Sequence, residues 1–141
     1  MRLIFVFLFP TVIFSQNFKL NKIFERAVLN QFSCDSLINY CSNEKNLQEK
    51  AYLGAGLILK AKHANSPFSK YSFFKKGSRK LDDAINKNPN FVEFRWLRYC
   101  LQKNAPKFLN YNKNLSEDKV FIEKKGTDQQ KRFLSQTLLN E

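Results

Sequence analysis

The sequence is poor in the residues that build reactive centres. Its 141 residues include one histidine, His63, and three cysteines with no Cys-x-x-Cys pair. Zinc sites and thiol redox centres take their ligands from clusters of these residues, so neither is predicted. A Ser-His-Asp order and a glycine-rich phosphate loop are also missing. We therefore predict a chain that is not an enzyme and that uses no metal and no cofactor.

Glycine and proline are scarce as well, with four of each. This composition excludes collagen-like and low-complexity chains. With 43% hydrophobic residues, the chain can bury one core, and its length fits one domain.

The first sixteen residues differ from the rest of the chain. Met1 and Arg2 precede a run of residues 3–14 without a charged side chain, and Ser15 and Gln16 follow. A basic start, a short apolar run and a small residue before the cut are typical of a secretory signal peptide. A membrane anchor is the alternative, but a span needs about 20 apolar residues. We predict a signal peptide at residues 1–15 and a single helical domain at 16–141, exported to the periplasm or the extracellular space.

The sequence leaves the pairing of the three cysteines, Cys34, Cys41 and Cys100, open. A disulfide between Cys34 and Cys41 requires a helix break between them, because seven residues of continuous helix span about 10.5 Å. A disulfide tolerates only roughly 4.4–6.8 Å between Cα atoms. An unpaired thiol often behaves as a small buried hydrophobe, so structural cysteine is the favoured interpretation.

Apolar residues recur at helical spacing along most of the chain. The clearest case is 70–87, where Tyr71, Phe74, Leu81 and Ile85 share one face. The same pattern predicts helices at 21–32, 46–64, 91–104, 116–125 and 127–139, whereas 33–44 is ambiguous. Neither strand-like alternation nor an Asn-Gly or Asp-Gly hairpin signal occurs. We predict an all-α fold of five to six helices packed as antiparallel hairpins.

Glycine and proline refine this prediction at two places. Gly54 and Gly56 would each cost about 1 kcal/mol relative to alanine in an exposed helix, so another helix is expected to approach them closely. Pro89 ends the helix before it and fits the first turn of the helix after it.

Part of the chain resembles a tetratricopeptide repeat. Gly77, Leu81, Ala84 and Pro89 match the spacing of its second helix, and Leu53-Gly54 followed by Leu57 resembles its first helix. The chain departs from the repeat by about eleven extra residues between the two helices and by the missing tryptophan. The resemblance implies a pair of helices at 46–64 and 70–87.

Residues 20–123 also resemble a group of small exported bacterial proteins of unassigned function. The resemblance rests on segments such as Asn88-Pro89-Asn90, Glu93-Phe94-Arg95-Trp96-Leu97-Arg98 and Pro106-Lys107-Phe108-Leu109. It implies a helical, tetratricopeptide-like domain and supplies no activity.

One charged cluster is the candidate partner-binding site. It consists of Glu93, Arg95 and Arg98 around Trp96. Arginine offers a planar fork that binds a carboxylate or another anion through two hydrogen bonds. The alternative is that these charges pair with neighbouring helices and fix the packing, which is the more usual role of such clusters.

Other titratable residues carry weaker signals. His63 near a helix end is favoured there by the helix dipole alone. The adjacent carboxylates Asp82-Asp83 and Glu117-Asp118 do not converge, because neighbouring helical side chains point about 100° apart. Glu117-Asp118 instead fits the first turn of a helix.

The charge of the chain is strongly positive. Lys and Arg number 24 against 12 Asp and Glu, and loss of residues 1–15 removes only Arg2, so the net charge falls from +12 to +11. Export argues against nucleic acid as a partner, as does the excess of lysine over arginine. The alternative explanation of the positive charge is a basic surface that only keeps the chain soluble.

Two functional hypotheses follow. The first is a non-catalytic interaction module of the bacterial cell envelope that binds a protein or peptide in a groove between helices, which predicts a concave apolar surface. The alternative is a basic surface binder of anionic envelope lipid or polysaccharide, which predicts that the basic residues form one face.

Overall fold

A computed structural model describes the backbone of residues 11–138 and the side chains of residues 19–134. Most of the predicted signal peptide, at residues 1–15, lies outside the described residues. Within the described part, no helix is both long and apolar enough to span a membrane.

The described chain is helical throughout and contains no strand. The all-α fold class is therefore confirmed, whereas the tetratricopeptide-like arrangement stays a prediction. The elements are α1 (Thr11–Leu29), α2 (Gln31–Cys41), α3 (Leu47–Lys60), η1 (Ala61–His63), α4 (Pro67–Lys87), α5 (Val92–Lys103), η2 (Lys107–Leu109), α6 (Leu115–Lys125) and α7 (Asp128–Leu138), where η marks a short 3₁₀ helix.

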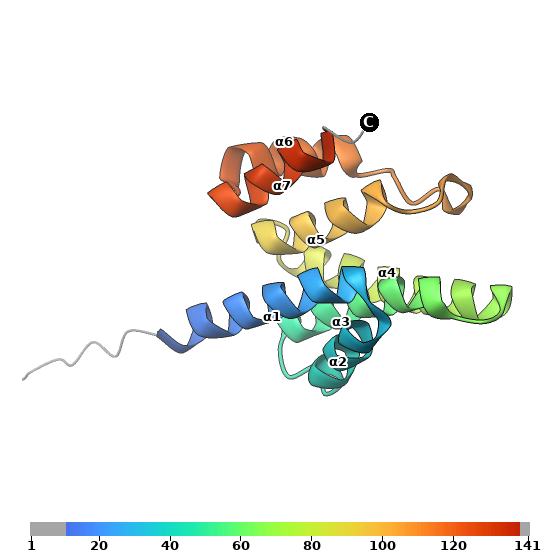
Figure 1. The fold of residues 1–141 in the computed structure, drawn as a ribbon. Coiled ribbons are helices and arrows are strands. Elements are labelled where there is room, and N and C mark those ends of the chain that lie inside the picture. Colours follow the sequence, from blue (N-terminus) through green and yellow to red (C-terminus); the bar gives the residue numbers. More distant parts are fainter. Residues whose placement is uncertain (1–10, 139–141) are drawn as a thin grey trace, which may run out of the picture.

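The helices stack in layers around α3. This helix contacts α1, α2, α4 and α5. Figure 1 shows α5 between this lower group and the pair α6 and α7, which lies at the opposite side of α5. α5 therefore joins the two parts of the molecule.

One cluster of buried apolar side chains takes members from every α-helix. Its members include Phe24, Leu37, Tyr52, Leu81, Leu97, Ile122 and Leu134. Phe24 of α1 packs edge to face against Tyr52, with ring centres 6.2 Å apart, and against Trp96, at 5.7 Å. Such aromatic pairs add stability beyond the area that they bury.

α3 and α4 run antiparallel and approach each other most closely at two glycines. A Cβ atom on Gly54 would lie 2.7 Å from the carbonyl oxygen of Gly77, and one on Gly77 would lie 2.5 Å from that of Gly54. The expected close approach of a helix to Gly54 is confirmed. An ion pair between Lys50 and Asp83 joins the same two helices.

The helix predicted at 21–32 breaks at Asn30. The backbone of Asn30 is extended, with φ of −149°, and its side chain accepts a hydrogen bond from the amide of Ser33 at 2.8 Å. Asn30 thus caps α2, which occupies the stretch that the periodicity left ambiguous. The described residues therefore hold seven α-helices rather than five to six.

The cysteines are buried free thiols. Cys34 and Cys41 lie on the continuous helix α2, which separates them too far for a disulfide. Burial raises the pKa of the Cys34 thiol to about 11 and that of Cys41 to about 12. The thiol of Cys34 donates to the carbonyl of Gly56 at 3.3 Å, so it fastens α2 to α3.

Several helix boundaries differ from the predicted ones. α1 begins at Thr11 rather than at residue 21, and α3 ends at Lys60 because the chain continues as η1 up to His63. α4 begins at Pro67, three residues early, because Ser66 caps it and proline is tolerated in a first turn. Pro89 lies in the turn between α4 and α5 rather than in a first helical turn, and α5 begins at Val92.

Candidate functional site

The charged cluster lies on α5, and Arg98 is its anchor to α6. The guanidinium donates from Nε to Oδ2 of Asp118 at 2.7 Å and from Nη2 to Oδ1 at 2.8 Å. Asp118 is fully buried in the first turn of α6, and Arg98 is 7% exposed. Two parallel hydrogen bonds of this kind form the strongest arginine–carboxylate geometry.

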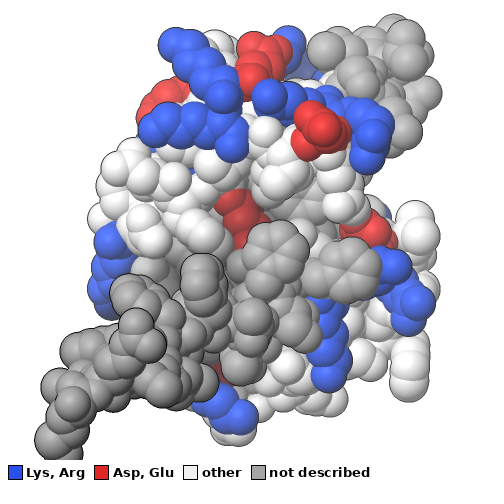
Figure 2. Space-filling model, turned by 90° about the vertical axis from the view of Figure 1, so that its left-hand side faces the viewer, with Lys and Arg blue, Asp and Glu red and all other residues white. Residues whose placement is uncertain are grey.

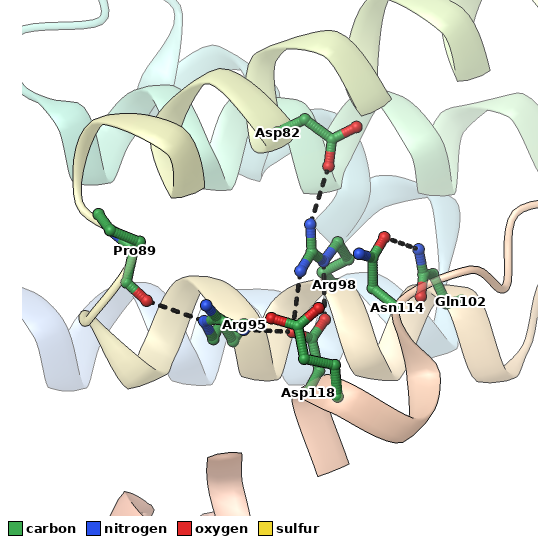
Figure 3. A network of polar contacts seen from close by, with 8 residues as sticks. Asp82, Pro89, Arg95, Arg98, Gln102, Asn114 and Asp118 are labelled. Atoms are coloured by element: carbon green, nitrogen blue, oxygen red, sulfur yellow. Dashed lines mark hydrogen bonds and ion pairs between the residues drawn. The ribbon is translucent and has the colours of Figure 1, made fainter. Parts of the chain in front are cut away.

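Arg98 also reaches α4. Its Nη1 lies 3.4 Å from Oδ1 of Asp82. Burial opposes the charge of Arg98, but the hydrogen bonds and charges of Asp118 and Asp82 outweigh this and raise the pKa of the guanidinium above its usual value. Burial raises the pKa of Asp82, against the opposing effect of Arg98. Figure 3 shows Asp82 and Asp118 approaching Arg98 from opposite sides.

Arg95 fixes the start of α5 to α6. Its Nε donates to the carbonyl of Pro89 at 2.8 Å, and its Nη1 donates to Oε1 of Glu117 at 2.7 Å and to Oδ1 of Asp118 at 3.2 Å. The hydrogen bond from Arg95 lowers the pKa of Glu117. The guanidinium also lies 4.4 Å from the ring centre of Phe121, where the cation meets an aromatic face.

Glu93 joins α5 to α3 instead of pairing with either arginine. Its carboxylate accepts hydrogen bonds from the hydroxyl of Tyr52 and from Nε2 of Gln48, the latter at 3.1 Å. Burial raises the pKa of Glu93, although these two hydrogen bonds oppose the effect. Burial and the nearby carboxylate raise the pKa of Tyr52 well above its usual value.

Trp96 lies in the core. It is 3% exposed and packs edge to face against Phe24 and Phe133, whose ring centres lie 5.7 and 5.6 Å away. Its indole N–H has no hydrogen-bond partner within the part of the chain that is described. Indole packing, not hydrogen bonding, holds this residue.

All four residues of the predicted partner-binding set are thus engaged within the chain. Glu93, Arg95 and Arg98 contact α3, α4, α6 and the turn at Pro89, which is the arrangement that the packing alternative describes. Only Trp96 of the four lines the apolar groove described next.

An apolar groove of about 730 Å³ lies where α1, α3, η1, α4, α5, η2 and α7 meet. Its base is formed by buried and half-buried side chains. They include Ile58, Leu59, Phe74, Trp96 and Leu101. A volume of this size falls within the range of about 300–1,000 Å³ that is usual for ligand pockets.

The lip of the groove is apolar and exposed. Leu29 of α1 and Phe108 of η2 are each 82% exposed, Tyr71 of α4 is 55% exposed and Val28 of α1 is 40% exposed. Figure 1 shows that the first turns of α4 and η2 lie at the same end of the molecule. Exposed apolar patches are uncommon on monomeric soluble proteins, where the larger ones often serve as ligand, protein or membrane contacts.

The charged residues at the groove are mostly basic. Lys62 of η1 and Lys70 of α4 line it, and within residues 19–134 neither has an ion-pair partner. Other lysines nearby are paired, as Lys60 is with Asp35 at 2.6 Å. Glu25 also lines the groove and accepts a hydrogen bond from Gln129 at 3.1 Å.

The histidine of the chain is not part of the groove. His63 lies exposed at the end of η1 and does not line it. Among the residues that the structure describes, no group of three or more His, Cys, Asp or Glu side chains is placed to hold a metal ion.

On the face that Figure 2 shows, Lys and Arg gather mainly at the upper end, where α6 and α7 are. Smaller groups lie at the left, right and lower edges. Acidic and uncharged surface separates these groups.

Comparisons with known proteins identified no relative of this chain. No protein-family model, no curated protein and no solved structure matches the chain. The tetratricopeptide-like character stays a prediction from the residues that carry it.

Proposed function

We propose that the chain is a non-catalytic, exported interaction module that binds a protein or peptide in the groove between its helices. The supporting observation is the groove itself, with its apolar base and its exposed apolar lip at Leu29, Tyr71 and Phe108. Leaving such side chains in water is unfavourable, and a partner that covers them gains about 25 cal/mol for each Å² of apolar surface removed from water.

The polar contacts of α5 fix the position of this helix beside the groove. Trp96 and Leu101 of α5 line the groove, while Arg98 and Glu93 of the same helix bind α6 and α3. Removing one partner of a buried, hydrogen-bonded ion pair lowers the stability of a protein by several kcal/mol. These contacts therefore oppose movement of α5 relative to α3 and α6. We therefore assign Glu93, Arg95 and Arg98 a positioning role beside the groove.

The proposed export rests on the signal-peptide pattern of the first sixteen residues. The core residues of α1 that the structure describes, Leu20, Phe24 and Ala27, lie after the predicted cut at Ser15. Cleavage there would leave these core contacts intact.

The test is selection of peptides from a displayed random library against the exported protein. Enriched peptides are expected to share apolar residues at helical or regular spacing and to bind in the groove. Ala61→Trp should abolish binding, because Ala61 lines the groove and the indole fills it. Ala64→Trp is the control, since Ala64 is equally half-buried, lies three residues away and does not line the groove.

Two results would refute the proposal. One is a selection that enriches no peptide. The other is a set of peptides that bind both variants as well as the parent protein. Circular dichroism of each variant checks that the helices are retained.

A further inference from the structure

We infer that the partner segment is an amphipathic helix with an acidic polar face. This inference rests on the proposed function and adds the chemistry of the ligand.

The charges at the groove favour an anionic partner. Lys62 and Lys70 line an otherwise apolar surface and have no ion-pair partner within residues 19–134. Lys107, which is exposed, precedes Phe108 on the lip. The one acidic side chain of the lining, Glu25, accepts a hydrogen bond from Gln129.

The shape of the lip favours a helix over a small amphiphile. Leu29 belongs to α1, Tyr71 to α4 and Phe108 to η2, so exposed apolar groups come from three separate elements around the hollow. A fatty acyl chain within the hollow would leave these groups in water. An amphipathic helix covers them, because its apolar residues at i, i+3 or i+4, and i+7 enter a groove while its flanks rest on the lip.

The charge of the chain disfavours a second copy as the occupant. After loss of residues 1–15 each copy carries a net charge of +11. Two such copies repel each other, whereas an acidic segment is attracted over the Debye length of about 10 Å at 0.1 M salt.

The experiment compares two synthetic peptides that share one apolar stripe of leucine and phenylalanine. One carries glutamate at all polar positions and the other carries lysine. Fluorescence anisotropy with the exported protein gives both affinities. We expect the glutamate peptide to bind about tenfold more tightly at 0.1 M salt, with the difference shrinking at 1 M salt, where the Debye length is about 3 Å.

Charge reversal locates the effect. Lys62→Glu combined with Lys70→Glu should remove or reverse the preference for the glutamate peptide. The control combines Lys76→Glu with Lys124→Glu, which are exposed lysines outside the groove, and it changes the net charge by the same amount. This control should keep most of the preference.

Each contrary outcome has a distinct meaning. Equal affinity for the two peptides, or equal loss in both charge-reversed variants, overturns the inference and leaves peptide binding in place. Binding of neither peptide, together with displacement of an apolar dye by a fatty acid, overturns the proposed function as well. A dimer in sedimentation that blocks peptide binding assigns the groove to a second copy and also overturns the inference.

Discussion

A methyl group at Gly77 should destabilise the fold, although alanine is the better helix former. In the interior of an exposed helix, replacing glycine with alanine stabilises by about 1 kcal/mol. At Gly77 the new Cβ would lie 2.5 Å from the carbonyl oxygen of Gly54 and 2.8 Å from the amide nitrogen of Ile58. Both are backbone atoms of α3, so they can give way only if α3 and α4 separate.

The size of the effect follows from two opposing terms. Overpacking a close-packed core costs about 1–3 kcal/mol and occasionally more, and a collision with rigid backbone belongs at the upper end. Subtracting the helix-propensity gain of about 1 kcal/mol leaves a net loss of about 2 kcal/mol in the free energy of unfolding for Gly77→Ala. Urea unfolding followed by far-ultraviolet circular dichroism measures this difference.

Gly56→Ala is the matched control. A Cβ atom on Gly56 would meet only side-chain atoms, with Cγ1 of Ile38 at 3.0 Å and Cδ2 of Leu37 at 3.5 Å. These side chains can adjust, so we expect a change within about 1 kcal/mol of the parent protein. A Gly77→Ala protein that is as stable as the parent would refute the close approach of α3 and α4.

Three other perturbations test the buried polar groups. Asp118→Asn should lower the free energy of unfolding by about 3–5 kcal/mol, because Arg98 loses its buried counter-charge and keeps only the longer contact with the half-exposed Asp82. Urea unfolding measures this loss, and a value below about 1 kcal/mol would contradict the pairing with Asp118. Burial raises the pKa of Glu93, so the native state binds more protons in mild acid, and the contribution of this carboxyl to stability falls as pH rises from its unfolded value of about 4.3 through the raised value. Glu93→Gln should remove that component from the pH dependence of unfolding, and an unchanged difference between the two curves would oppose the assigned shift. The thiols of Cys34 and Cys41, with pKa values of about 11 and 12, should react slowly with a disulfide reagent at pH 8 in the native protein and fast in urea, whereas rapid native labelling would contradict their burial.

The helices with a one-sided apolar face could be predicted from the sequence, and α2 could not. In residues 70–87 the apolar side chains share one face of the helix and the charged side chains occupy the other, as in a helix that packs with one face against a core. The buried side chains of α2 are Cys34, Leu37 and Cys41, so two of its three anchors are small residues that carry little hydropathy signal. The cap at Asn30, which separates α1 from α2, acts through a local hydrogen bond that periodicity does not reveal.

The members of the charged cluster could be predicted from the sequence, but their partners could not. Arg98 pairs with Asp82 and Asp118, which lie 16 and 20 residues away on two other helices. Spacing within one helix says nothing about such contacts, because they depend on how α4, α5 and α6 pack.

The groove could not be predicted from the sequence. Its lip combines Leu29 and Phe108, which lie far apart along the chain and are brought together only by the fold. Both look like ordinary core candidates in the sequence, and only their exposure marks them as surface. The one available signal was the aromatic residue in the short segment after Pro106, between two predicted helices.

A nuclear magnetic resonance titration tests peptide binding in the groove most directly. Isotope-labelled exported protein would be titrated with the glutamate-faced helical peptide, and each shift would be mapped onto the structure. We predict saturable shifts at Leu29, Tyr71 and Phe108 and little change in α6. Shifts concentrated on α6, or no saturable shift at any peptide concentration, would contradict binding in the groove.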